Sequence, residues 1–202
     1  MKNKIIFLLI PMLISSFLFG GCFQKEEPED MGSEQPDESF VGEVVEVEAV
    51  LEDWNGNWNA LITYLDNEEL AGSLDVDDSW KQEQQTDLIS FRFQGTSLTA
   101  YSEPQAAEIS RFPEGSILFD YTYDCLGMVK DGQGITWYQF ETSTQSPYQY
   151  LLLTEIDDSV TPSFYIRYGA EGFDALYAMK DWKPMMVSSA ATAEEIGALI
   201  AN

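Results

Sequence analysis

The strongest hydrophobic pattern of the chain lies in residues 51–70. Its large apolar side chains recur at helical spacing on one side: Trp54, Trp58, Leu61, Ile62 and Leu65. This spacing predicts an N-terminal amphipathic helix, which Asp53 would cap. Two tryptophans on one stripe need an apolar partner, so we expect the helix to cover a β-structure. The tryptophans would then be core residues or would line a ligand pocket beneath the helix.

Strand patterns recur at short intervals after this helix. They occupy residues 88–93, 97–101, 117–123, 135–141, 148–154 and 163–168. Turn-forming sequences such as Gln94-Gly95-Thr96 and Asp131-Gly132-Gln133-Gly134 separate them. Short sequential strands joined by tight turns favour an antiparallel meander that closes as a β-barrel. Earlier in the chain, Val45 and Val47 alternate with glutamates, which fits either a short edge strand or a linker.

Helical signals return at the C-terminus. Residues 171–182 carry an incomplete apolar stripe, and Thr192-Ala193-Glu194-Glu195 is a capping box that precedes Ile196. The polar stretch 75–85 fits a loop or a short helix. We therefore predict a mainly β fold, an antiparallel barrel with an N-terminal amphipathic helix and C-terminal helices.

The first residues predict the location of the protein. Lys2 and Lys4 precede an apolar run, and the sequence Leu18-Phe19-Gly20-Gly21-Cys22 follows it. This order is typical of a secretory signal peptide, and its end resembles a bacterial lipobox. We expect residues 1–21 to be a lipoprotein signal peptide and Cys22 to carry the lipid, which anchors the protein at the cell membrane, facing outside the cytoplasm. The alternative is an ordinary signal peptide with a chance cysteine.

Acidic residues dominate the remaining chain. The full sequence has a net charge of −25, and loss of Lys2 and Lys4 with the signal peptide brings it near −27. Such a charge disfavours nucleic-acid partners and attracts cations. Residues 22–48 are rich in Glu, Asp and Pro and are predicted to form an acidic disordered linker. Residues 49–202 then form one domain, and its single cysteine, Cys125, is expected to be a buried or inert thiol.

Catalytic motifs are not found in the sequence. The chain contains no histidine, so neither a Ser-His-Asp nor a Cys-His arrangement is available. Gly132-Gln133-Gly134 is interpreted as a hairpin turn and not as a phosphate-binding loop. No spacing singles out a pair of catalytic carboxylates. We therefore predict a binding protein and not an enzyme.

Several motifs together resemble the ZinT (YodA) family. The opening Asp53-Trp54-Asn55-Gly56-Asn57-Trp58 is similar to the D-W-x-G-x-W motif of that family, and Pro162-Ser163-Phe164-Tyr165-Ile166-Arg167-Tyr168-Gly169 resembles its C-terminal block. Trp182-Lys183-Pro184 and Glu194-Glu195-Ile196 extend the similarity, which covers about residues 50–202. The resemblance implies a calycin-like barrel, related in shape to lipocalins. It also implies extracytoplasmic zinc binding for zinc acquisition, with components of a metal-uptake transporter as partners.

The chain departs from this family at the zinc ligands. By the resemblance, the three histidine ligands of the family correspond to Thr154, Ser163 and Tyr165. Hydroxyl and phenol groups are poor zinc ligands compared with imidazole. Strand alternation also places Arg167 on the same face as Ser163 and Tyr165. We expect the inherited zinc site to be lost, so that zinc as a cofactor is implied by the resemblance alone.

Carboxylates are the remaining candidate ligands. Glu155, Asp157 and Asp158 follow Thr154 directly, and Asp75, Asp77 and Asp78 form a second group. Carboxylate oxygens suit calcium or manganese better than zinc. Neither group has the spacing of an EF-hand loop, and both also fit solvated acidic loops.

Two functions from different classes follow from the sequence. The first is metal-ion handling, through oxygen ligands or as a partner in zinc uptake without a site of its own. The second is a repurposed lipocalin-like barrel that binds a small apolar or aromatic ligand, or a partner protein. Its expected cavity would be lined by the aromatic side chains of Trp137, Tyr148, Tyr150 and Tyr165.

Overall fold

The computed structural model describes residues 44–46, 51–65, 76–105 and 116–201. All of them belong to one compact unit, which comprises Glu38–Asn202. The predicted signal peptide, Cys22 and most of the predicted linker lie outside the described residues, and these predictions stay open. No helix within the described ranges is long and apolar enough to cross a membrane.

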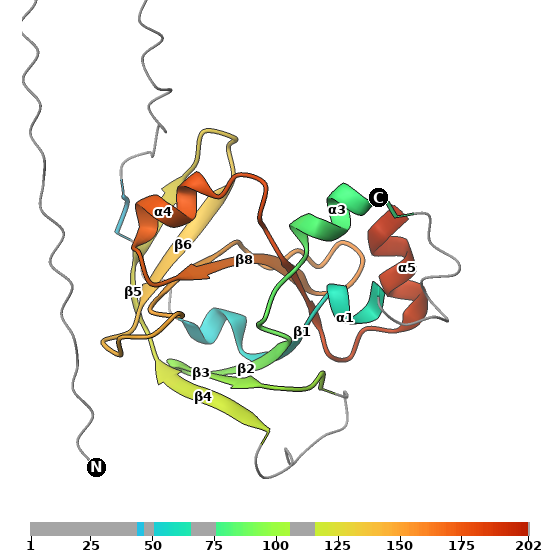
Figure 1. Ribbon diagram of the computed structural model, residues 1–202, viewed down its shortest axis with the longest axis horizontal. Coiled ribbons are helices and arrows are strands. Elements are labelled where there is room, and N and C mark those ends of the chain that lie inside the picture. Colours follow the sequence, from blue (N-terminus) through green and yellow to red (C-terminus); the bar gives the residue numbers. More distant parts are fainter. Residues whose placement is uncertain (1–43, 47–50, 66–75, 106–115, 202) are drawn as a thin grey trace, which may run out of the picture. The chain divides into compact units, whose positions relative to one another are not determined.

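One antiparallel sheet dominates this unit. Its nine strands are β1 (Gly56–Ala60), β2 (Ser90–Gln94), β3 (Ser97–Tyr101), β4 (Ile117–Thr122), β5 (Asp124–Lys130), β6 (Thr136–Glu141), β7 (Tyr150–Leu153), β8 (Ser163–Gly169) and β9 (Met185–Ser188). They follow the order β4-β3-β2-β1-β9-β8-β7-β6-β5. The sheet curls into a half-barrel whose edge strands, β4 and β5, are joined by Tyr123 alone (Figure 1). The predicted antiparallel β-barrel architecture is confirmed.

The residues of β8 show how side chains alternate between the two faces of the sheet. Phe164, Ile166 and Tyr168 join the main core, a cluster that includes buried side chains from most of the strands. Tyr165 instead packs against the outer cluster, which consists of Val129, Trp137, Leu152, Leu176 and Tyr177. The period of two therefore places the positions that resemble the zinc ligands of the family on the outer face.

The prediction of one amphipathic helix over residues 51–70 is wrong. Its first part is a 3-10 helix, η1 (Leu51–Trp54), followed by strand β1 and a short helix α1 (Ile62–Leu65), while residues 66–70 lie outside the described ones. Gly56 has φ +151°, which a side chain would strain, and β1 then pairs with both β2 and β9. Pairing on both sides outweighs the helical pattern of the apolar residues.

Three strands were not predicted, namely β1, β5 and β9. Strand β5 contains Gly127 and a register shift between Cys125 and Gly127, which breaks the alternation of its side chains. Strand β9 has only four residues and follows Pro184 directly. The predicted strands are all present, with bounds that differ by up to two residues. A short strand whose apolar and polar side chains do not alternate is recognised only from the strands that pair with it.

An N-terminal segment pairs with the edge of the sheet at β5. Val45 and Met128 exchange two backbone hydrogen bonds of 2.9 Å, so this valine is in strand-like pairing, as one of the two sequence alternatives proposed. Gly127 has φ +139°, and a Cβ added there would lie 2.7 Å from the backbone oxygen of Val45. Glycine is therefore required for this close approach. Val47 lies outside the described residues.

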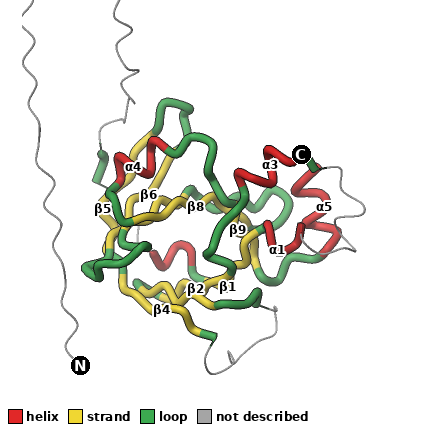
Figure 2. The backbone as a smooth tube through the Cα atoms, viewed as in Figure 1, coloured by secondary structure: helices red, strands yellow, loops and turns green. Residues whose placement is uncertain are grey.

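The other described helices are short covers of the sheet: α3 (Asp78–Glu83), α4 (Phe173–Ala178) and α5 (Ala193–Ala201). Helix α4 packs against β7 and β8, whereas α1, α3 and α5 gather at the other end of the sheet in this view (Figure 2). The predicted capping box is confirmed, because Thr192 N donates to Glu195 Oε2 (2.7 Å) and Glu195 N donates to Thr192 Oγ1 (3.3 Å). Buried Ile196 anchors α5 against Leu61 and Val187.

A group of aromatic rings links β4 to β8 within the main core. Phe119 stacks on Tyr148 with 4.4 Å between ring centroids, and Tyr148 contacts Tyr168 at 5.2 Å. Both phenols donate hydrogen bonds to the carboxylate of Asp87. The hydroxyl of Tyr123 donates to the Tyr148 carbonyl oxygen at 2.6 Å. These phenols are needed in their neutral, donating form.

We expect the fold to lose stability in alkali because of two of these tyrosines. Burial raises the pKa of Tyr123 and Tyr168 far above the ordinary value of 10.0. Between pH 10 and pH 11 only the unfolded chain ionises them, so the two together cost about 3 kcal/mol of the free energy of unfolding by pH 11. Their contribution is fully present below pH 10. Urea unfolding at pH 8, 10 and 11 measures this loss.

The matched control is the Tyr123→Phe/Tyr168→Phe variant. It lacks both ionising groups, so its stability should change less between pH 8 and pH 11 than that of the parent chain. An equal loss in both proteins would assign the alkaline effect to general charge repulsion.

Candidate functional site

The three positions that resemble the histidine ligands of the family do come together in the structure. We call them the β7–β8 position: Thr154, directly after β7, and Ser163 and Tyr165 on β8. The backbone N–H of Thr154 donates to the Tyr165 carbonyl oxygen (3.1 Å), and the N–H of Tyr165 donates to Thr154 Oγ1 (3.0 Å). Ser163 is buried and exchanges backbone hydrogen bonds with Asp157. The structure thus brings Thr154 against Tyr165, and Ser163 lies two residues before Tyr165 on the same strand.

The hydroxyl of Thr154 is already used within the fold. Thr154 Oγ1 accepts from Tyr165 N and donates to the Glu155 carbonyl oxygen at 3.2 Å. The pKa of the Tyr165 phenol is raised by burial and, next, by the negative charges of Glu83 and Asp157. At neutral pH the phenol therefore stays protonated, and the position offers no anionic ligand. Neutral hydroxyls without imidazole make a weak zinc site.

A positive charge also lies beside the β7–β8 position. The Lys183 Nζ stands 5.8 Å from the centroid of the Tyr165 ring, at cation–π distance. A divalent cation bound here would be repelled by this ammonium group. The sequence places Lys183 in the C-terminal block, but only the fold brings it over Tyr165.

Arg167 faces the outer side of β8, as predicted, and is almost fully buried. Its Nε donates to the Trp182 carbonyl oxygen (2.9 Å), Nη1 to Leu176 (3.2 Å) and Nη2 to Lys180 (3.5 Å). The guanidinium also stacks on Trp137, with 4.6 Å between Cζ and the ring centroid. Arg167 is thus a structural clamp that holds the segment after α4 on the sheet.

The candidate carboxylates are engaged separately. Glu155 Oε1 accepts from the Tyr138 hydroxyl at 2.8 Å, whereas Asp157 Oδ1 accepts from Ser159 N at 2.8 Å, which lowers the Asp157 pKa. Asp158 is exposed. Across the described ranges, no group of three or more His, Cys, Asp or Glu side chains is arranged to hold a metal ion. The described part of the chain thus gives no support to a carboxylate site for calcium or manganese.

In the second acidic group, Asp75, Asp77 and Asp78, one member has a structural role. Asp77 caps α3, because its Oδ1 accepts from Ser79 N at 2.7 Å, and Asp78 is exposed in the first turn. Asp75 lies outside the described residues. The stretch 75–85 therefore contains a short helix, which was one of its two predicted forms.

Cys125 is a half-buried thiol on β5. Burial raises its pKa, and the nearby charge of Asp53 raises it further. The thiol therefore stays protonated at neutral pH and is a poor nucleophile. This agrees with the predicted buried or inert thiol.

The aromatic cavity proposed for the repurposed barrel is not present as predicted. Tyr148 belongs to the main core, whereas Trp137, Tyr150 and Tyr165 belong to the outer cluster beneath α4. Trp137 is fully buried. Tyr148 precedes β7 and packs into the main core, whereas the other three side chains share the outer cluster, so the four cannot line one cavity.

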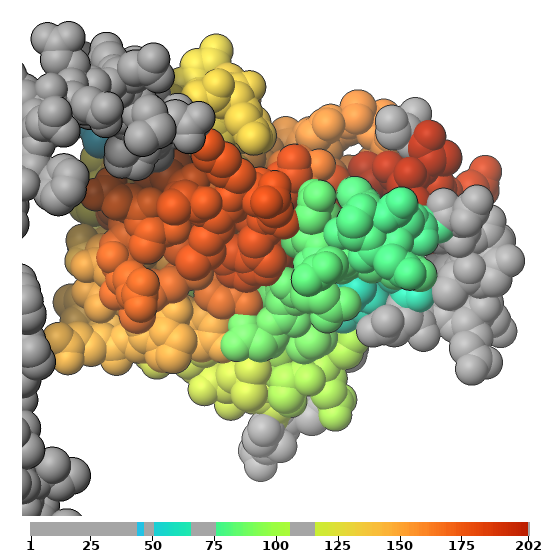
Figure 3. Space-filling view, turned by 45° about the horizontal axis from the view of Figure 1, so that its top comes forward, coloured from blue at the N-terminus to red at the C-terminus, as the bar shows by residue number. Residues whose placement is uncertain are grey.

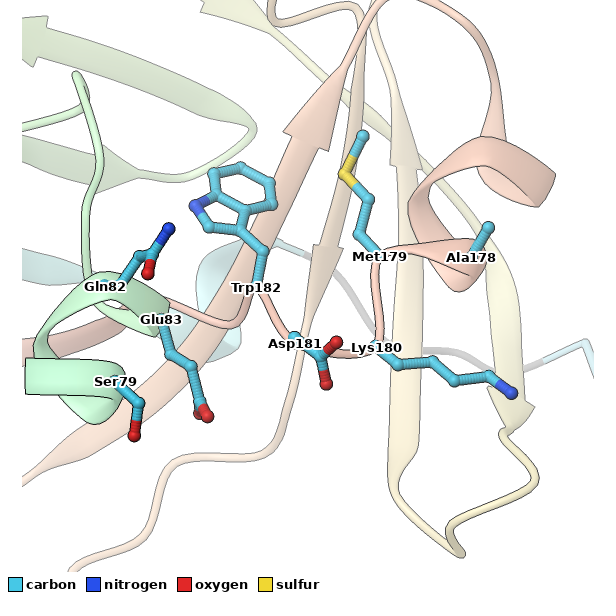
Figure 4. A pocket seen from close by; sticks show the side chains of 8 residues that line it. All are labelled: Ser79, Gln82, Glu83, Ala178, Met179, Lys180, Asp181 and Trp182. Carbon is cyan, nitrogen blue, oxygen red and sulfur yellow. The ribbon is translucent and has the colours of Figure 1, made fainter.

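The structure contains instead a groove that the sequence analysis missed. It lies between α3 and residues 178–182, and its volume is about 610 Å³. Glu83 and Gln82 from α3 face Asp181 and Trp182 from the segment after α4 (Figure 4). The surface of α3 lies directly beside that of this segment (Figure 3). The sequence signal was Trp182. It was predicted to belong to the apolar stripe of a helix over residues 171–182, but α4 ends at Ala178, and Trp182 lies in the segment that follows.

Comparison with solved structures decides the fold. The zinc(II)-bound ZinT-like domain of AdcA from Streptococcus pneumoniae matches with a TM-score of 0.55 and 17% identity, over 77% of this chain and 92% of that one. The chain has the fold of a ZinT-like domain. Zinc(II)-bound AdcA from Streptococcus pneumoniae matches with a TM-score of 0.54 and 17% identity, over 88% of this chain.

The ZinT-like fold accounts for only part of the longer relative. This chain covers 42% of the length of AdcA. No family model and no curated protein matches the sequence. The similarity to the ZinT-like domain therefore establishes the architecture, and the ligands must be judged from the residues of this chain.

Proposed function

We propose that this protein is an extracytoplasmic lipoprotein, anchored through Cys22, whose ZinT-like domain serves metal-ion acquisition without coordinating zinc at the inherited position. It would act as a partner of metal-uptake transporter components. The fold supports the metal-related family, and the predicted signal peptide supports the location. The proposal that zinc is not coordinated rests on the β7–β8 position. There the hydroxyl of Thr154 is hydrogen-bonded within the fold, and the Lys183 ammonium group lies beside Tyr165.

The charge of the chain supports a role near cations. A net charge near −27 after removal of the signal peptide raises the local concentration of cations through a long-range field. Such a field needs no organised ligand set, and it weakens with salt because the Debye length shortens. Diffuse attraction and specific coordination can therefore be separated by experiment.

The test is calorimetric titration of the mature chain, with Cys22→Ser in place of the lipidated cysteine. Zinc, manganese and calcium are titrated in turn at physiological salt. We expect no zinc binding tighter than about 10 µM, because no imidazole or thiolate set is available. We also expect no rise in melting temperature with any of the three cations.

Submicromolar zinc binding would contradict the proposal. Cys125→Ser and Glu155→Gln variants would then show whether the thiol or the carboxylates supply the ligands. A heat signal that disappears in high salt would instead indicate the diffuse field, in agreement with the proposal.

A further inference from the structure

The groove between α3 and residues 178–182, which we call the Trp182 groove, has the dimensions of a small-molecule site. Its volume of about 610 Å³ falls within the range of ligand pockets. It is separate from the β7–β8 position, whose Thr154, Ser163 and Tyr165 are not among its lining residues. A ligand here would be recognised by a different set of side chains, although the charge of Glu83 also acts on Tyr165.

The wall of the groove is held in place by the fold. The indole Nε1 of Trp182 donates to the Gln85 carbonyl oxygen at 2.7 Å, and the ring packs edge-on against Tyr168 at 5.0 Å. The carbonyl oxygen of Trp182 accepts from the buried Arg167. An aromatic wall fixed before binding loses little freedom when a ligand arrives.

The opposite wall is equally fixed. Helix α3 is tied to the segment before β9 by Gln84, whose side chain is buried. Gln84 Oε1 accepts from Met185 N at 2.8 Å, and Lys183 N donates to the Glu83 carbonyl oxygen at 3.4 Å. Both sides of the groove are therefore anchored on the same stretch, residues 182–185.

The charges in the groove favour a cation. Glu83 extends from α3 toward the segment that carries Asp181, while the side chain of Lys180 points away from α3 (Figure 4). Within the described ranges, neither carboxylate accepts a side-chain hydrogen bond or forms an ion pair. Met179, which is 39% exposed, adds apolar surface beside them. The groove thus combines two carboxylates with an indole and a thioether.

We propose that the Trp182 groove binds a small organic cation with an apolar chain and one or two ammonium or guanidinium groups. The cationic groups would pair with Glu83 and Asp181. The chain would lie along Trp182 and Met179, where the indole also attracts positive charge. The acidic surface of the whole protein would raise the association rate of such a ligand.

The probe for the test is 1,6-diaminohexane, which carries two ammonium groups on an apolar chain. Its neutral counterpart, 1,6-hexanediol, has the same length and no charge. Calorimetry and tryptophan fluorescence with the mature Cys22→Ser chain should show saturable one-to-one binding of the diamine and none of the diol. Equal binding of both probes, or no saturable binding of the diamine at millimolar concentration, would overturn the proposal.

Matched variants locate the binding. Glu83→Gln/Asp181→Asn removes both groove carboxylates and should weaken diamine binding by about tenfold or more. Asp78→Asn/Asp174→Asn removes two exposed carboxylates from α3 and α4 outside the groove, with the same change in net charge. The second variant should bind within about twofold of the parent. An equal loss in both would overturn the proposal in favour of a diffuse field.

Discussion

We expect a variant with Thr154→His, Ser163→His and Tyr165→His to bind zinc at least about 100-fold more tightly than the parent chain. Ser163 and Tyr165 are two residues apart on β8, so their side chains share the outer face. Thr154 is hydrogen-bonded to Tyr165 across the strands. Three imidazoles in this arrangement can occupy three corners of a tetrahedron, and water can fill the fourth.

Lys183 decides how much of this affinity is realised. Its ammonium group lies beside Tyr165, so the further substitution Lys183→Ala should increase zinc affinity in the three-histidine variant and leave the parent unable to bind zinc. Calorimetry at neutral pH measures both effects. A control with three dispersed histidines, Thr99→His, Thr144→His and Ser159→His, has the same number of imidazoles and should bind weakly.

The buried Ser163 is the risk in this design, because a larger side chain there can disturb the packing. The variant with only Thr154→His and Tyr165→His changes two half-buried positions. It should show intermediate zinc affinity if the geometry is retained. A folded three-histidine variant that binds no more tightly than the dispersed control would refute the view that only the ligands have been lost.

The second large effect is expected from Arg167→Ala, which should lower the free energy of unfolding by about 3–5 kcal/mol. Three carbonyl oxygens, from Leu176, Lys180 and Trp182, would lose their donor inside the protein. The substitution also leaves a cavity where the guanidinium stacks on Trp137. Urea unfolding followed by circular dichroism measures the loss.

Two further variants separate the causes of this effect. Arg167→Met keeps most of the volume over Trp137 but no donors, so its stability should lie between those of Arg167→Ala and the parent. Arg92→Ala removes a half-buried arginine from β2 and should cost less than about 1 kcal/mol. A loss below about 1 kcal/mol for Arg167→Ala would show that the carbonyl oxygens are satisfied in another way.

The sequence by itself determined the strand-rich architecture and the absence of imidazole ligands. Ser97–Tyr101 is a strand as predicted because its pattern and its flanking turns are local features. The capping box at Thr192 is likewise local, since both partners lie within one helical turn. The absence of histidine is a property of composition, so no fold can restore imidazole ligands to the β7–β8 position.

Only the tertiary structure decided the remaining features, because they depend on partners distant in sequence. Gly56–Ala60 became a strand through pairing with β2 and β9, although its tryptophans have helical spacing. The fold also placed Lys183 over Tyr165, and it buried Arg167 against carbonyl oxygens 9 to 15 residues away. The Trp182 groove exists because α3 and the segment after α4, about a hundred residues apart, meet at Gln84. Periodicity in a sequence indicates which face of an element is apolar, whereas long-range pairing decides which elements form and what they enclose.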